Sequence, residues 1–143
     1  MEKDSLGYEM EKQIADTARE VGREIYKNIL LETEEWLYQN RDKKIFQVKT
    51  YTKSTLKTLL GPIELKRRLY QMRLPLADTK SVYLLDEVVY GENKKVGCFS
   101  VAAAEEIARM RDSEGLSFKQ ISEQVKTKLN LNITCLLYTS RCV

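Results

Sequence analysis

The sequence contains no histidine, and this absence removes several classes of chemistry. Without imidazole, Ser-His-Asp triads and most catalytic zinc sites are excluded for this chain of 143 residues. No run approaches the roughly 18 apolar residues that a membrane span needs, and Met1 to Asp4 are too polar and acidic for a secretory signal. We therefore expect a cytoplasmic protein that has no membrane partner.

Cysteine is also scarce, and two of the three cysteines lie in an unusual tail, residues 135–143. The tail CLLYTSRCV corresponds to the codons TGT CTC TTA TAC ACA TCT followed by AGA TGT GTA and a TAA stop. The second part is the reverse complement of the last four codons of the first, which resembles two transposon-end adapters of sequencing libraries joined head to head. The tail is thus expected to be non-native, and the alternative is a genuine C-terminal strand.

Removing the tail leaves Cys98 as the one native cysteine, since Cys135 and Cys142 belong to the tail. A native disulfide and a CxxC zinc site are then both excluded. We expect neither a metal nor another cofactor in this chain. Because no histidine is present to activate its thiol, Cys98 is predicted to be a small buried or loop residue and not a nucleophile.

The net charge of +3 is distributed unevenly along the chain. Lys and Arg number five against ten Asp and Glu over residues 1–40, eleven against three over 41–80, and seven against eight over 81–134. The balance is therefore −5, then +8, then −1. The basic middle indicates a polyanion as partner. The alternative is a solvated basic surface that balances the acidic segment before it.

Apolar residues recur every three or four positions between Tyr8 and Asn40. This spacing predicts a long amphipathic helix that makes up the first domain, residues 1–40. Its apolar stripe consists of Ile14, Ala18, Val21, Ile25, Ile29 and Trp36, and it is widened by Leu30 and Leu37. A helix of this kind needs a packing partner. Three partners remain open: the following sheet, a missing part of the protein, or another copy in a homo-oligomer formed through this helix.

Alternating apolar and polar residues predict a small antiparallel sheet in the second domain, residues 41–90. Four strands are expected, over residues 45–52, 54–60, 63–74 and 82–89, and Gly61 with Pro62 marks the turn of a hairpin. In the third strand one face is predicted to be basic, with Glu64, Lys66 and Arg68 opposite Ile63, Leu65 and Leu69.

After a polar loop, residues 98–134 are predicted to form the first two helices of an incomplete helix-turn-helix unit. Ser100 is a candidate N-cap and Gly115 supplies the turn. Ser117 and Gln120 have the spacing of a capping box at the start of the second helix. The third, recognition helix would follow this pair. Together these elements predict an α+β fold.

The order of these elements resembles the N-terminal region of the ISLre-type insertion-sequence transposases. The resemblance covers residues 8–134 and rests on the stretches VGREIYKNILLE, LKTLLGPIELKRRLYQ, VYLLDEVVYG and LSFKQISEQV. It implies a DDE transposase whose RNase H-like domain, downstream of these residues, cuts and joins DNA with Mg²⁺ held by three acidic residues. No catalytic residue carries over to this chain, which is expected to be inactive alone. Related transposases often have a zinc ribbon in the hairpin region, but Gln71, Arg73 and Thr79 stand there and no cysteine does.

Phosphate contacts are predicted from the basic hairpin. The principal candidates are Lys66, Arg67, Arg68 and Arg73, supported by Lys43, Lys44, Lys49, Lys53 and Lys57. Contacts of this kind give affinity for transposon-end DNA but no choice of sequence. Asp86 and Glu87 form a tempting carboxylate pair, yet neighbours on a strand point to opposite faces, so we expect a structural role for them and no metal site.

Two functions of different classes remain open. The first is the DNA-binding, accessory region of a transposase, truncated before its catalytic domain. The second is a non-enzymatic interaction protein in which the acidic helix mediates association and the basic sheet balances its charge. A reading frame that continues past Thr134 in an intact copy of the locus would favour the first, and a native stop there would favour the second.

Overall fold

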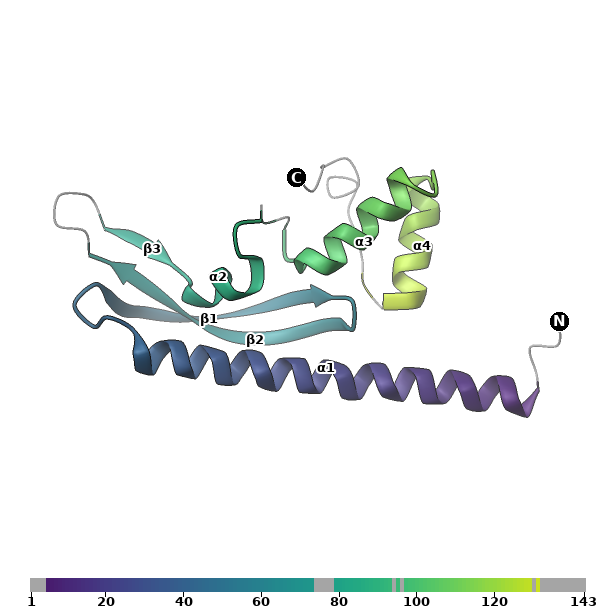
Figure 1. The fold of residues 1–143 in the computed structure, drawn as a ribbon, viewed down its shortest axis with the longest axis horizontal. Coiled ribbons are helices and arrows are strands. Elements are labelled where there is room, and N and C mark those ends of the chain that lie inside the picture. Colours follow the sequence, from purple (N-terminus) through teal and green to yellow (C-terminus); the bar gives the residue numbers. More distant parts are fainter. Residues whose placement is uncertain (1–4, 74–78, 94, 96, 130, 132–143) are drawn as a thin grey trace.

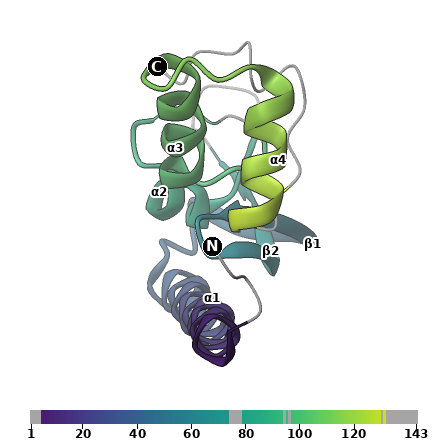
Figure 2. The same ribbon diagram turned by 90° about the vertical axis from the view of Figure 1, so that its right-hand side faces the viewer.

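The computed structural model describes residues 5–73, 79–93, 95, 97–129 and 131. Helix α1 (Leu6–Asn40) runs along one edge of a sheet of three antiparallel strands and contacts α2 (Leu84–Tyr90). Two further helices, α3 (Val101–Asp112) and α4 (Phe118–Leu129), lie on the other side of the sheet from α1 (Figures 1 and 2). The expected α+β fold is therefore confirmed. The tail from residue 135 lies outside the described residues.

Helix α1 confirms the long N-terminal helix. Its N-cap is Ser5, whose side chain accepts the backbone N–H of Tyr8 at 3.1 Å. At 1.5 Å per residue, its 35 residues span about 50 Å, and its first turns extend past the sheet (Figure 1). The residues that α1 buries are Leu30 and Glu34. Leu30 and the half-buried Leu37, which widen the predicted apolar stripe, pack into the core, whereas Glu34 was not predicted there.

The predicted first and second strands form one continuous strand, β1 (Phe46–Thr58). The predicted break was wrong because the threonines around it are good strand formers that carry the pairing through. A β-bulge at Lys49 shifts the register between Val48 and Thr50. Strand β1 pairs with β2 (Gly61–Met72) through a tight turn at residues 59–60, and Gly61 follows that turn with a φ of 116°, which favours glycine.

The predicted fourth strand over residues 82–89 is wrong. Only β3 (Lys80–Val82) joins the sheet, beside the end of β2, and helix α2 follows it. The sequence LLDEVVY is a short apolar run without clear alternation, which suits a buried helix as well as a strand. As a helix, it directs Leu85 and Val89, four residues apart, into the core.

Helices α3 and α4 confirm the predicted helical pair and both of its caps. Ser100 accepts the N–H of Ala103 at 3.2 Å, and Ser117 and Gln120 form a reciprocal capping box. The pair has a hydrophobic core of its own, made of Phe99, Ala103, Ala104, Ile107, Met110, Ile121, Val125, Leu129 and Leu131. The predicted recognition helix falls outside the described residues.

A second core joins α1, the hairpin and α2. Its buried members are Leu30, Leu56, Ile63, Leu65, Leu85 and Tyr90. Beyond its short pairing with β3, strand β2 has an open edge, and α1 covers it. There the backbone N–H of Arg68 donates to Oε1 of Glu34, at 3.2 Å, so that a buried carboxylate takes the place of a neighbouring strand.

The side chain of Arg68 reinforces the same contact. Its guanidinium lies 2.8 Å from Oε2 of Glu35, 3.8 Å from Oε1 of Glu34 and 4.2 Å above the ring of Tyr38. Burial raises the pKa of the Glu34 carboxyl, and the hydrogen bond from Arg68 opposes that rise. The carboxylate is therefore costly to bury. Its Oε1 accepts the N–H of Arg68, whereas its buried Oε2 has no hydrogen-bond partner among the described residues.

We predict that Glu34→Ala lowers the free energy of unfolding by about 2 kcal/mol, because it leaves a buried N–H on β2 without an acceptor. Urea denaturation measures this loss. The matched control is Glu35→Ala, which removes the exposed partner of the same arginine and should cost less than about 1 kcal/mol. Equal losses in the two variants would contradict the role given to Glu34.

We also predict a pH dependence that Glu34→Gln removes. Because the pKa of Glu34 is raised in the folded state, folding takes up a proton between this raised pKa and the ordinary value of 4.5. The wild type should therefore gain stability relative to Glu34→Gln as the pH falls through that window, and lose it as the pH rises. Urea denaturation of both proteins between pH 4 and 7 tests the sign, and a difference that is flat or opposite would contradict it.

Candidate nucleic-acid interface

Two of the predicted phosphate contacts are engaged inside the fold. Arg67 points to the face of the hairpin that packs against α2, where it forms a salt bridge with Asp86 and stacks 4.1 Å from the ring of Tyr83. Arg68 is held by Glu34 and Glu35 of α1, as described above. Their side chains are only 12% and 15% exposed. The charges of both arginines are therefore paired with carboxylates inside the fold, where they hold the hairpin against its neighbours.

The opposite face of the hairpin is exposed and carries lysines. Lys53 and Lys66 lie directly across from each other in the antiparallel register, and both are exposed. The ammonium of Lys66 lies 5.0 Å above the ring of Tyr51. Like charges directly opposite each other destabilise a pair of strands. This face of the hairpin therefore places two like charges directly opposite each other.

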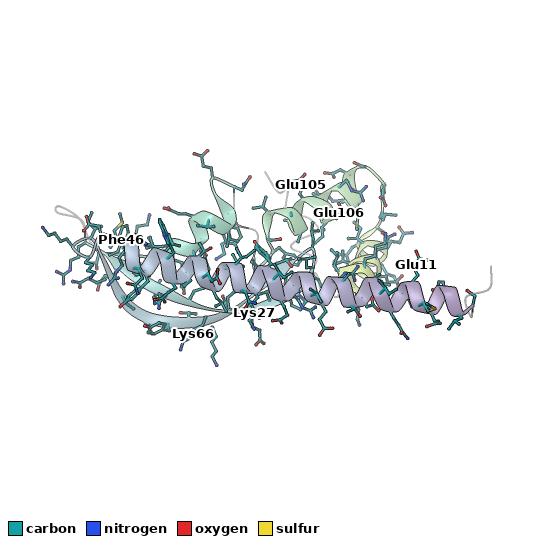
Figure 3. All side chains as sticks on the ribbon, turned by 60° about the horizontal axis from the view of Figure 1, so that its bottom comes forward. Glu11, Lys27, Phe46, Lys66, Glu105 and Glu106 are labelled. Carbon is teal, nitrogen blue, oxygen red and sulfur yellow. The ribbon has the colours of Figure 1, made fainter. Side chains whose placement is uncertain are left out.

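Helix α1 adds a third lysine to this face. Lys27 of α1 lines a groove with a volume of about 530 Å³ together with Leu31, Lys53, Ser54, Thr55, Glu64, Leu65 and Lys66. Figure 3 shows Lys27 and Lys66 near each other on the same side of the molecule. We call this feature the lysine groove.

The lysine groove has an excess of positive charge, because its three lysines face one carboxylate, that of Glu64. Within the described part of the chain, none of the three ammonium groups forms a salt bridge. Sequence reasoning missed Lys27 because it lies in the acidic segment. The available signal was the series Lys12, Arg19, Arg23 and Lys27, whose members are separated by 7, 4 and 4 residues. This spacing places all four cations on one side of a helix.

The other predicted contacts are spread along the hairpin. Lys49 is exposed at the β-bulge, and Arg73 is exposed just after β2, where its backbone N–H donates to the carbonyl of Ile45 at 2.8 Å. Lys57 is half-buried, with its ammonium 5.0 Å from the ring of Phe99. Lys43 and Lys44 are exposed in the turn that precedes β1. The structure thus brings Lys53 and Lys66 together and leaves the others apart from them.

The acidic pair of α2 has a structural contact. Asp86 binds Arg67 and lies 3.5 Å from the ammonium of Lys95, and Glu87 is exposed. Across the described ranges, no group of three or more His, Cys, Asp or Glu residues could hold a metal ion. Cys98 is a free, half-buried cysteine in the segment that bridges to β1. None of the described helices is both long and apolar enough to cross a membrane.

The family model described as uncharacterised protein family UPF0236 matches residues 5–130, which include every helix and strand described above. No curated protein and no solved structure matches this chain.

We predict that Lys53→Glu stabilises the free protein by about 0.5 kcal/mol, because it replaces the repulsion with Lys66 by an attraction across the strands. Denaturation at low salt measures the gain, and added salt should reduce it. Lys49→Glu is the control, since the bulge leaves Lys49 without a residue directly opposite. A loss of stability in Lys53→Glu, or a gain that salt does not alter, would show that the two lysines do not repel.

Proposed function

We propose a function for this chain, which belongs to the uncharacterised protein family UPF0236: it binds the phosphate backbone of DNA as the accessory region of a transposase. The observation that carries the proposal is the lysine groove. The directly opposed pair Lys53 and Lys66, with Lys27 beside it, concentrates positive charge on an exposed surface of the hairpin.

The electrostatics of the groove support a polyanion as ligand. In the free protein, the repulsion between Lys53 and Lys66 costs stability. A phosphate chain that lies in the groove would turn this cost into attraction and release the counterions of the nucleic acid. Lysine provides a flexible point charge, which suits contact with phosphates at any sequence.

The proposed binding is independent of sequence. In a helix-turn-helix unit, the base edges are read by a recognition helix in the major groove, and the predicted recognition helix lies outside the described residues. Helices α3 and α4 form a separate small core that is linked to β1 by the backbone hydrogen bonds of Lys57 with Cys98 and Ser100. The groove would therefore supply affinity and position, while sequence choice would come from elsewhere.

The proposal assigns the metal chemistry of DDE transposases to another domain. The carboxylate of Asp86 is already bound to Arg67 and close to Lys95. An Mg²⁺ ion needs carboxylates that converge and are free to coordinate. We therefore assign no catalytic residue here. The proposal places the protein with the DNA in the cytoplasm.

We predict weak binding to duplex DNA, with a log-log salt slope of roughly −3 to −4 if the groove and its neighbours make three or four phosphate contacts. Replacing both Lys53 and Lys66 with Ala should flatten the slope by about two, and Lys27→Ala should flatten it by a further ~0.9. Fluorescence anisotropy with a labelled duplex at several salt concentrations gives these slopes.

The matched control for this experiment is the double variant Lys126→Ala/Lys128→Ala on α4, which removes the same charge from exposed positions far along the chain. Its slope should stay close to that of the wild type. If the two double variants weaken binding equally, only net charge matters and the groove is not the site. Undetectable binding at low salt would favour the interaction-protein function.

A further inference from the structure

Helix α1 has an apolar side that the described fold does not cover. Its large residues are between 52% and 65% exposed, and they are Met10, Ile14, Val21, Ile25, Ile29 and Trp36. We call this row the outer stripe. Near its N-terminal end, Met10 and Ile14 line a shallow groove of about 490 Å³ with Gln13, Thr17 and Ala18. A continuous row of exposed apolar side chains on a folded protein marks a binding surface.

The outer stripe lies on the side of α1 that faces away from the sheet. A cation lies two positions before four of the stripe residues: Lys12 before Ile14, Arg19 before Val21, Arg23 before Ile25 and Lys27 before Ile29. Two positions in an α-helix correspond to a rotation of about 200°. Because Lys27 lines the groove beside the sheet, the stripe points the opposite way, where no described helix or strand lies (Figures 1 and 2).

The charges on this side of α1 are acidic. Glu11 precedes Ile14 by three residues, Glu24 follows Val21 by three, and Glu32 follows Ile29 by three, so each lies next to the stripe. All three are exposed. The four cations of the helix are on the other side, toward the sheet. The outer stripe is thus an apolar row with carboxylates along its length and no lysine or arginine among them.

The acidic residues along the outer stripe indicate which kind of partner binds it. A second copy of the chain would place its own carboxylates against these in a parallel or an antiparallel pairing, and like charges at an interface oppose association. DNA and anionic lipids are repelled for the same reason. We propose that the outer stripe docks a basic amphipathic helix of another polypeptide, whose apolar residues fill the stripe and whose lysines or arginines pair with Glu11, Glu24 and Glu32.

The chain contains its own reporter of docking, because its single tryptophan, Trp36, belongs to the stripe and is 62% exposed. The probes are two synthetic helical peptides with one leucine pattern, flanked by lysines in the first and by glutamates in the second. The lysine peptide should shift the Trp36 emission to the blue and saturate, with an affinity that falls as salt is added. The glutamate peptide should leave the emission unchanged.

A pair of matched variants locates the site. Ile25→Asp on the stripe should weaken binding of the lysine peptide at least tenfold. Val88→Asp on α2 is the matched control, because Ile25 and Val88 are almost equally exposed, at 55% and 54%, and it should leave binding unchanged. Circular dichroism of both variants checks that they stay folded. The Lys53→Ala/Lys66→Ala variant should bind the peptide like the wild type, which separates this proposal from DNA binding.

Three results would overturn the proposal. The first is equal binding of the lysine and glutamate peptides, which would remove the charge argument. The second is binding of the lysine peptide that leaves Trp36 emission unchanged or survives Ile25→Asp. The third is a wild-type dimer, seen by sedimentation equilibrium, that Ile25→Asp converts to monomer, because the occupant would then be a second copy of this chain.

Discussion

The contact between the backbone N–H of Arg68 and the buried carboxylate of Glu34 determines how this molecule is assembled. It closes the open edge of β2 and fixes the rotation of α1 about its own axis. Lys27 lies seven residues before Glu34, two turns along the same side of the helix, and so it is brought to the groove beside Lys53 and Lys66. The same rotation turns the apolar side of α1 outward. The proposed DNA site and the proposed docking surface both depend on this one interaction.

Three consecutive cations of β2 show how neighbouring residues of similar charge take different roles. Lys66 is exposed beside Tyr51, Arg67 is paired with Asp86 on the inner face, and Arg68 is held at the edge by α1. The planar guanidinium groups combine ion pairing with stacking on tyrosine rings, for which arginine is well suited. The ammonium of Lys66 keeps its charge at the surface. In this hairpin Arg67 and Arg68 stabilise the fold, while Lys53 and Lys66 stay exposed, as the proposed binding of DNA requires.

The parts of the fold with local signals could be predicted from the sequence. Ser100 and Ser117 cap the helices that they were expected to cap, because capping depends on residues a few positions apart. Helix α2 was mistaken for a strand because its seven residues carry no period that separates the two structures. The place of Lys27 in the groove depends on the tertiary contact of α1, since periodicity shows that a helix has sides but not which side meets the sheet. Of the predicted apolar stripe, only Leu30 and Leu37, the residues that widen it, pack into the core, while the rest of the stripe faces outward.

The most direct test of the account is a nuclear magnetic resonance titration of the isotope-labelled protein with a short DNA duplex, following both backbone amides and lysine side chains. If DNA lies in the lysine groove, the shifts that change with DNA should cluster at Lys27, Lys53 and Lys66 and on the strands around them, while the resonances of Arg67 and of the outer stripe should stay in place. Changes centred on α4 or along the outer stripe, or no change at low salt, would contradict it.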